Sequence, residues 1–439
     1  MDSVLTKSKQ FEQLVISKDP IYNDMLAATE IVKDFIREHG LILYGGSGLD
    51  YALRLHGDKI YPDDMLPDLD FYSPDSIEHA YTLSDILYGH GYKDTRVVVA
   101  THTETMKVDL ADNHWIADIS YRPKDMFALI PYLEYDGMKI VHPNFQRIDM
   151  HSALAFPYDN APREVIFDRL AKDVKRFNLL AKYYPLPEVG PTIQLKKITV
   201  PNYNHVLAGF AALAAMRAVV ADMSTNTTNT PATTPTTFRV TKHTVEFDTL
   251  EGVCEYVHFN PIHACEEMGL DKVTSYEPYI NLILPRVEAI GDYNGKVIKY
   301  CFNSTTNRLV GVNYAKISDV IIRFVCPQFL LKYFISMYYV HKEQPRTAAT
   351  YLQGYIDVLS MIDNFPPSTN VYGNENINLA KEIMLNRLYT GLDGAEPIKI
   401  PMNYYPGRSL PAGRPHPAFD PDSVEYLRES GKIIVTATE

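Results

Sequence analysis

Residues 41–48 read Leu-Ile-Leu-Tyr-Gly-Gly-Ser-Gly, and residues 67–72 read Pro-Asp-Leu-Asp-Phe-Tyr. The apolar run 41–44 predicts a short buried strand, and the apolar spacing of residues 49–56 is typical of a helix. A glycine-rich turn between a strand and a helix lets backbone N–H groups come close to phosphate oxygens. The first stretch therefore predicts a phosphate-binding turn.

The residues of this turn expected to bind a nucleotide are Gly45, Gly46 and Ser47, the last through its hydroxyl group. A Walker-type phosphate loop is disfavoured because no Gly-Lys-Ser/Thr sequence follows the glycines. Taken alone, a Gly-Gly-Ser-Gly run is most often a plain turn between two elements.

The second stretch places two carboxylates on one face of a strand. Alternate side chains of a strand share a face, so Asp68 and Asp70 project together. Carboxylates in this arrangement can hold Mg²⁺ or Mn²⁺, and two such ions can assist phosphoryl displacement. A third carboxylate is expected from a neighbouring strand. Asp118 is the preferred residue, and Asp109 is the alternative.

The order strand, Gly-Gly-Ser, helix, and strand with Asp-x-Asp resembles the polymerase-β-like nucleotidyltransferase superfamily. The stretch between Ser47 and Asp68 is longer than is usual in that superfamily. We therefore interpret residues 57–67 as an insertion.

Residues 163–183 predict an amphipathic helix with two distinct faces. The expected buried face consists of Ile166, Leu170, Val174, Phe177 and Ala181. The residues of another face, expected to engage the triphosphate, are Arg169, Lys172 and Arg176. A solvated charged face balanced by nearby aspartates is the alternative interpretation.

Residues 167–185 read Phe-Asp-Arg-Leu-Ala-Lys-Asp-Val-Lys-Arg-Phe-Asn-Leu-Leu-Ala-Lys-Tyr-Tyr-Pro. This segment resembles a helix of the poly(A) polymerase catalytic subunits of nucleocytoplasmic large DNA viruses, most closely the giant-virus type. Residues 324–341 and 403–406 resemble the same family. The resemblance extends over most of residues 30–410.

The resemblance implies template-independent addition of AMP from ATP to the 3′ end of RNA. It implies two Mg²⁺ or Mn²⁺ ions held by Asp68, Asp70 and Asp118, and it implies a homodimer. It further implies a location in the cytoplasm of an infected cell, in the virus factory, or in the virion. The alternatives are a nucleotidyltransferase acting on a small molecule or oligonucleotide, and a catalytically silent RNA-binding processivity protein.

Composition limits the class of protein. The chain has 439 residues, 46% of them hydrophobic, and a formal net charge of −12. No run approaches the roughly 18 apolar residues of a membrane span, and the first residues lack a signal-peptide pattern. The acidic balance argues against a surface coated with nucleic acid, so RNA contacts are expected to be local.

The expected fold class is α/β with mixed sheets. We expect an N-terminal helical segment at 1–40, a nucleotidyltransferase catalytic domain at 41–190, and a degenerate nucleotidyltransferase-like domain at 191–439 that shapes the RNA path. Residues 224–237 predict a flexible loop. The expected helices are 23–39, 74–89 with Ser73 as its cap, 143 onward, 328–341, 346–362 and 376–388. The expected further strands are 92–101, 105–110, 114–121, 238–247, 296–303 and 309–317.

Overall fold

The structure is a computed structural model that describes most of residues 20–362. The gaps in this range are 64, 101–104, 111–113, 123, 156–162, 201–205, 228–237, 241–244, 251–253, 259–272, 276–286, 292–296, 304–311 and 318–319. Pro406 and isolated positions before residue 20 are also described. The predicted helix 376–388 lies outside the described residues.

The described residues divide into two compact units. The first contains the residues up to Gln146 together with Arg176–Pro185, and the second contains Arg147–Lys175 and the residues from Leu186 to Ile362. The predicted domain boundary at residues 190–191 stays a prediction. None of the described helices combines the length and apolar character that a bilayer span requires.

The first unit is built on a mixed seven-stranded sheet of order β3-β4-β5-β2-β1-β7-β6. Its strands are β1 (Ile42–Tyr44), β2 (Leu69–Ser73), β3 (Arg96–Val99), β4 (Thr105–Asp109), β5 (Trp115–Tyr121), β6 (Tyr132–Tyr135) and β7 (Met138–Val141). Only the β1–β7 and β2–β5 pairs are parallel. The mixed α/β sheet predicted from the sequence is thus confirmed.

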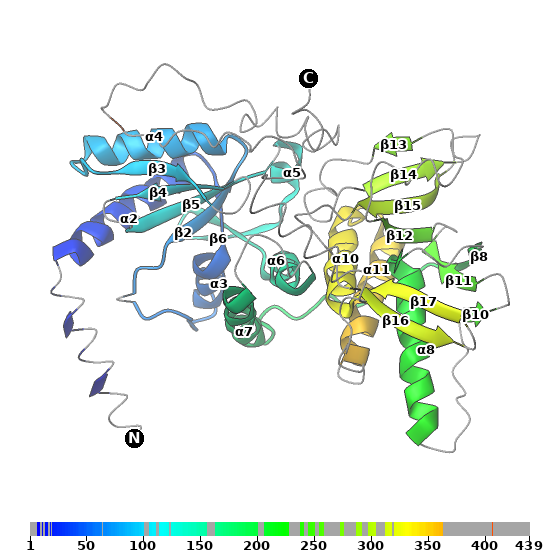
Figure 1. Cartoon of the computed structure of the whole chain (residues 1–439). Coiled ribbons are helices and arrows are strands. Elements are labelled where there is room, and N and C mark those ends of the chain that lie inside the picture. Colours follow the sequence, from blue (N-terminus) through cyan, green and yellow to red (C-terminus); the bar gives the residue numbers. More distant parts are fainter. Residues whose placement is uncertain are drawn as a thin grey trace. The chain divides into compact units, whose positions relative to one another are not determined.

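The helices of the sequence up to residue 180 are divided between the two units, because Arg147–Lys175 belongs to the second unit. The helices of the sequence up to residue 180 are α2 (Pro20–Glu38), α3 (Gly45–Arg54), α4 (Ser76–Gly89), α5 (Lys124–Leu129), α6 (Pro143–Ala155) and α7 (Arg163–Leu180). Helix α2 buries Ala28, Val32, Phe35 and Ile36, whose i, i+4 and i+3 spacing makes one face. Helix α4 lies along β3 and β4 (Figure 1). Gly40 ends the α2 segment with a φ of +61°, as the sequence predicts.

Three local predictions were wrong in detail. Helix α3 begins at Gly45 and not after the glycines, so the glycines form its first turn. Helix α4 begins at Ser76 and not at Pro74, and Ser73, the predicted cap, is instead the last residue of β2, where its hydroxyl accepts a hydrogen bond from the Asp75 N–H. The side chain of Val174 on α7 is 41% exposed, whereas Phe177 and Leu180 are buried.

The second unit holds a three-stranded and a seven-stranded sheet. The first has the order β10-β11-β8, from β8 (Lys196–Val200), β10 (Phe238–Val240) and β11 (Val245–Thr249). The larger sheet is formed by β9 (Val206–Leu207), β12 (Cys254–His258), β13 (Val273–Ser275), β14 (Val287–Gly291), β15 (Val297–Asn303), β16 (Val312–Ile317) and β17 (Val320–Val325).

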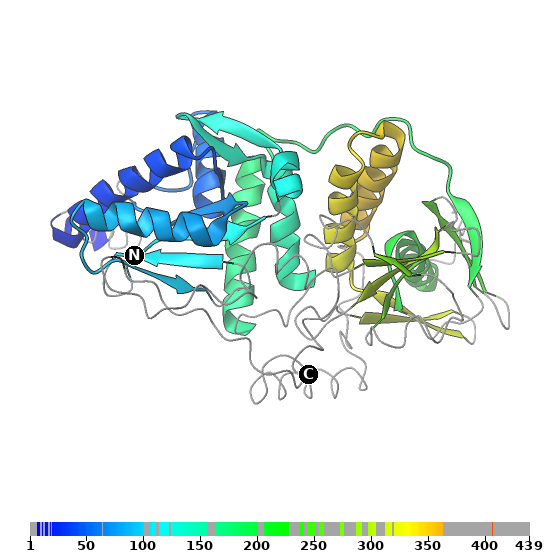
Figure 2. The ribbon, with the colours of Figure 1, turned by 90° about the horizontal axis from the view of Figure 1, so that it is seen from above.

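Besides most of α6 and α7, the second unit contains three further long helices among its described residues. They are α8 (Gly209–Thr227), α10 (Pro327–Val340) and α11 (Pro345–Ile362). Helices α10 and α11 lie side by side (Figures 1 and 2). Helix α8 reaches into the segment predicted as a loop at 224–237, so that prediction was wrong for residues 224–227.

The two large sheets share one topology. The larger sheet of the second unit has the order β13-β14-β15-β12-β9-β17-β16. When the strands of each sheet are numbered by their succession along the chain, both orders read 3-4-5-2-1-7-6. In both sheets the same two pairs are parallel, here β9–β17 and β12–β15. The second unit therefore repeats the architecture of the first.

Candidate functional site

Three carboxylates meet at the start of β2. Asp68 precedes β2, and Asp70 lies within it, opposite Asp118 in the parallel pair with β5. One carboxylate oxygen of each of the three residues lies within 4.8 Å of the other two. Asp68 is exposed, and the other two are half-buried. Such a set of hard oxygen ligands fits a divalent cation such as Mg²⁺ or Mn²⁺.

A lysine lies beside this acidic cluster, which we define as Asp68, Asp70 and Asp118. The Lys107 Nζ lies 2.8 Å from the Asp118 Oδ2, and the two residues are register partners on β4 and β5. Its positive charge offsets part of the repulsion among the three carboxylates. The sequence prediction did not include Lys107 in the site. The alternation of β4, which puts Lys107 on a polar face, was the available signal.

Asp109, the alternative third carboxylate, lies apart from the cluster. The register of β4 against β5 shifts between Val108 and Asp109. The Asp109 side chain is 0% exposed, and its Oδ2 accepts hydrogen bonds from the Arg96 guanidinium at 2.8 Å. Its carboxylate therefore belongs to a cross-strand ion pair. The geometry favours Asp118 as the third member, and its role as a ligand stays a prediction.

The glycines of the turn allow the cluster to approach the start of α3. Gly45 has a φ of +68°, and a Cβ atom there would lie 2.1 Å from the Asp70 Oδ2. Gly46 is equally crowded, since a Cβ there would lie 2.2 Å from the Tyr61 hydroxyl. The Gln146 Nε2 donates a hydrogen bond to the Gly45 carbonyl oxygen at 3.0 Å. The positive φ and the contact with Asp70 favour glycine at residue 45, whereas a side chain at residue 46 would displace the ends of the Tyr61 and Arg176 side chains.

The Ser47 hydroxyl has a partner within the protein. It is buried and donates a hydrogen bond to the Asp68 carbonyl oxygen at 3.0 Å. This bond ties the residue before β2 to the first turn of α3. Ser47 therefore positions the cluster, and its predicted contact with phosphate stays a prediction.

The predicted basic face is described in part. Arg176 is half-buried, and its guanidinium donates a hydrogen bond to the Tyr61 hydroxyl. A Cβ at Gly46 would lie 2.9 Å from the Arg176 Nη2, so this guanidinium borders the turn. Lys172 is exposed, and the side chain of Arg169 is not among those described.

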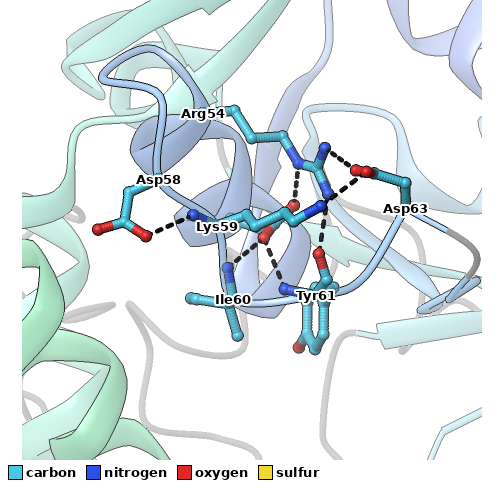
Figure 3. Close-up of polar contacts among 7 residues, drawn as sticks. Arg54, Asp58, Lys59, Ile60, Tyr61 and Asp63 are labelled. Atoms are coloured by element: carbon cyan, nitrogen blue, oxygen red, sulfur yellow. Dashed lines mark hydrogen bonds and ion pairs between the residues drawn. The ribbon is translucent and has the colours of Figure 1, made fainter.

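The interpreted insertion, residues 57–67, is fixed to α3 by ionic contacts. Asp50 is 2% exposed, and its carboxylate accepts hydrogen bonds from the backbone N–H groups of Ile60 and Tyr61. Arg54 contacts Asp63 and the Tyr61 carbonyl oxygen (Figure 3). Hydrogen bonds from Lys59 and Arg54 hold the pKa of the Asp63 carboxyl below its usual value. The sequence did not indicate these contacts.

The second unit preserves one carboxylate of this arrangement. Gly209, with a φ of +55°, begins α8 as Gly45 begins α3, and a Cβ there would lie 2.3 Å from the Glu255 Oε2. Glu255 on β12 holds the place of Asp70 on β2. Tyr300 is its register partner, at the place of Asp118. The Tyr333 hydroxyl donates to the Glu255 Oε1 at 2.6 Å, and burial raises the pKa of the Glu255 carboxyl to about 7.

Comparison with known proteins agrees with this geometry. Residues 30–160 match a family model described as "Poly(A) polymerase catalytic subunit". A protein of African swine fever virus (isolate Tick/Malawi/Lil 20-1/1983), named as a poly(A) polymerase catalytic subunit, is 38% identical over 323 residues, 70% of this chain and 65% of that protein. A protein of Acanthamoeba polyphaga mimivirus with the same name is 33% identical over 179 residues, 40% of this chain and 30% of that protein.

A solved structure shares the fold. The crystal structure of the Megavirus polyadenylate synthase matches with a TM-score of 0.61 at 19% identity, over 88% of this chain and 81% of that one.

The chain shares the fold of the Megavirus structure, and its first mixed sheet carries the acidic cluster and the glycine turn. Residues 30–160 match the poly(A) polymerase catalytic subunit family, and the resemblance indicated by the motifs is confirmed. The chain spans 65% of the length of the African swine fever virus relative.

The crowding at Gly45 generates a first prediction. Gly45→Ala adds a Cβ at a positive φ and forces Asp70 away, so the affinity for Mn²⁺ is expected to fall by about tenfold or more. Gly57→Ala is the matched control, because Gly57 has a φ of +78° and no atom within 4 Å of the added Cβ. It shares the backbone strain, about 1 kcal/mol. Calorimetric titration with Mn²⁺ measures the affinity, and thermal unfolding measures the loss of stability caused by the backbone strain. Equal Mn²⁺ affinities in the two variants would contradict the prediction.

Asp118 and Asp109 are expected to respond in opposite ways. Asp118→Asn removes a cluster carboxylate and should weaken Mn²⁺ binding by about tenfold or more at unchanged stability. Asp109→Asn breaks a buried ion pair and should lower the free energy of unfolding by about 1–3 kcal/mol at unchanged Mn²⁺ affinity. Mn²⁺ titration and urea unfolding of both variants decide between the two residues. The reverse pattern would make Asp109 the third ligand.

Glu255 generates a prediction about pH. Its carboxyl ionises near pH 4.5 when unfolded but near pH 7 in the folded protein. The folded state therefore holds a proton that the unfolded state releases, and the stability contributed by Glu255 falls as the pH rises from about 4.5 to 7. Glu255→Gln should remove about 3 kcal/mol of that fall. Urea unfolding between pH 4.5 and 8 measures the slope, with Glu246→Gln as control. A slope unchanged by Glu255→Gln would contradict the assignment.

Proposed function

We propose that this protein is a polynucleotide adenylyltransferase that adds AMP from ATP to the 3′ end of RNA without a template. The observation that carries the proposal is the acidic cluster, whose oxygens lie within 4.8 Å of one another beside a glycine turn. The names of the viral relatives support it. In the reaction the RNA 3′-hydroxyl attacks the α-phosphate of ATP, the bond to the β-phosphate breaks, and pyrophosphate leaves.

The cluster residues Asp68, Asp70 and Asp118 would hold two Mg²⁺ or Mn²⁺ ions. When bound, these ions supply charge neutralisation for the attacking and leaving oxygens. The Ser47 hydroxyl holds the Asp68 backbone in place, and the Lys107 ammonium balances the charge of Asp118. Little covalent chemistry is required of the protein, so positioning and electrostatics account for its contribution.

The start of α3 and the Arg176 guanidinium form the proposed triphosphate site. The first N–H groups of a helix have no partner within the helix, and the N-terminal end of the helix dipole favours anions. Gly45 and Gly46 begin this helix, and Arg176 borders it. Arg169 and Lys172 remain predicted contributors from the same face of α7.

The proposal is tested with a 5′-labelled RNA primer, each of the four nucleoside triphosphates in turn, and Mg²⁺ or Mn²⁺. Of the four nucleotides, only ATP is expected to extend the primer into long products. Asp70→Asn should reduce extension by about 100-fold or more, because a lost ligand removes several kcal/mol of charge stabilisation. Asp136→Asn, a change of an exposed aspartate in the same unit, should leave extension intact.

Failure to extend any primer with any nucleotide would overturn the proposal. Products that form from nucleotides without a primer would instead identify an enzyme that makes oligonucleotides. RNA binding without any transfer would identify a silent processivity protein.

We further infer a symmetric homodimer, acting in the cytoplasm of an infected cell or carried in the virion. A net charge of −12 gives no uniform attraction to RNA, so retention of a growing tail requires a local groove or a second subunit. Twofold symmetry is the commonest closed assembly. Light scattering should give twice the chain mass of 49.9 kDa. A monomer would contradict this inference.

A further inference from the structure

We propose that Tyr61 is a positioning residue of the nucleotide site: the Asp50-anchored loop holds its hydroxyl over Gly46, and that hydroxyl fixes the Arg176 guanidinium for the phosphate chain. The inference rests on the proposed function only in taking a nucleoside triphosphate as the ligand. It assigns a role to the insertion at residues 57–67, which the proposed reaction does not otherwise use.

The loop is anchored at a buried carboxylate. Asp50 accepts hydrogen bonds from the N–H groups of Ile60 at 2.6 Å and Tyr61 at 2.8 Å, and from the Arg54 Nε at 2.5 Å. A buried carboxylate is stable only when its oxygens are paired in this way. Since Asp50 lies on α3, the backbone of Tyr61 is fixed to the helix that begins with the glycine turn.

A second set of contacts closes the loop from its outer side. The Arg54 guanidinium donates to the Asp63 carboxylate at 2.6 Å and to the Tyr61 carbonyl oxygen at 3.0 Å (Figure 3). Lys59 donates to the other oxygen of Asp63 at 2.6 Å. Tyr61 is therefore held through both its N–H and its carbonyl group. Such anchoring at both ends of one residue limits where its side chain can reach.

The Tyr61 side chain extends from this anchor to the turn. Its hydroxyl would lie 2.2 Å from a Cβ at Gly46, so the absence of a side chain at residue 46 admits it. The same hydroxyl accepts a hydrogen bond from the Arg176 Nη2, and the Arg176 guanidinium carbon lies 5.6 Å from the centre of the Tyr61 ring. Residues 115 positions apart in the sequence are thus joined directly above the phosphate-binding turn.

The energetic consequence is preorganisation. An arginine side chain loses substantial rotational freedom when it binds an anion, and a contact that fixes it beforehand reduces that cost. A hydrogen bond from a charged donor is also stronger than one between neutral groups. Removal of the Tyr61 hydroxyl should therefore weaken phosphate binding although the hydroxyl itself carries no charge.

The test compares Tyr61→Phe with Tyr92→Phe. Both changes remove one hydroxyl that makes a hydrogen bond, and the Tyr92 hydroxyl donates to the Asp24 carbonyl oxygen at 3.0 Å, away from the turn. Calorimetric titration uses inorganic tripolyphosphate and ATP, each with Mg²⁺. Tyr61→Phe should weaken binding of both probes by about five- to tenfold. Tyr92→Phe should leave both affinities unchanged. In the primer assay the KM for ATP should rise by the same factor at constant kcat.

A double-mutant cycle separates positioning from direct contact. If Tyr61 acts through Arg176, Tyr61→Phe in an Arg176→Gln background should cause no further loss of tripolyphosphate affinity. Additive losses would overturn the inference, because Tyr61 would then act on the ligand itself. Unchanged or tighter binding by Tyr61→Phe would also overturn it.

The anchor is tested with two exposed aspartates. Asp63→Asn weakens the outer contacts of the loop, whereas Asp136→Asn weakens a comparable ion pair with Arg37; the two carboxylate side chains are 69% and 67% exposed. Only Asp63→Asn should weaken tripolyphosphate binding, by about two- to fivefold. Equal effects of the two changes on tripolyphosphate affinity would contradict a role of the loop in positioning Tyr61.

The binding measurements use no RNA and no turnover, so they fail independently of the proposed function. Normal tripolyphosphate binding without primer extension would overturn the proposed function and leave the role of Tyr61 standing. A wild-type protein that binds neither probe would overturn the role of Tyr61.

Discussion

The contact between the Gly45 α-carbon and the Asp70 carboxylate is the constraint on which the site depends. A Cβ at residue 45 would lie 2.1 Å from the Asp70 Oδ2, and the φ of +68° turns the chain from β1 directly into α3. Only glycine satisfies both conditions without strain. The contact brings the start of a helix, with its excess of N–H donors, to a carboxylate on a neighbouring strand. It therefore places the proposed anion site beside the proposed cation site.

The second unit repeats this contact between a glycine and a carboxylate, but the side chains around it differ. Gly209 and Glu255 keep the same geometry in a sheet of the same topology, yet the carboxylate is buried and hydrogen-bonded by the Tyr333 hydroxyl. Tyr300 stands at the register position that corresponds to Asp118. A single buried carboxylate of raised pKa serves packing at a helix start, whereas three carboxylates in contact favour a cation. Tyr300 therefore leaves the second unit without a carboxylate at the position that corresponds to Asp118.

Electrostatic balance links the cluster to the loop beside it. Three carboxylates repel one another in the folded chain, and Lys107 on β4 offsets part of that cost. On the other side, Asp50 accepts hydrogen bonds from the Ile60 and Tyr61 N–H groups of the loop and from the Arg54 guanidinium, which compensate its charge. The loop thereby carries Tyr61 to Arg176 and brings a positive charge to the edge of the turn. The negative charge of the acidic cluster and the positive charge of Arg176 thus lie in adjacent parts of one site.

The sequence by itself determined the elements whose signals are local. The alternation around Asp68 and Asp70, the glycine run and the apolar stripe of the first long helix indicated the strand, the turn and the mixed α/β fold. Local spacing could not determine the start of α3, where β1 runs directly into the helix. It also could not separate Asp109 from Asp118, since both alternate with apolar neighbours on adjacent strands.

The tertiary structure separates the two residues in space, because the β4 register shift after Val108 and the pairing with Arg96 direct Asp109 away from the cluster. The ligand role of Asp118 stays a prediction. The contacts of Asp50 with the loop and of Tyr61 with Arg176 were likewise decided by the fold. Tyr61 and Arg176 are distant in the sequence, and the partners of Asp50 lie in a loop without periodicity. Local sequence patterns predict neither kind of contact.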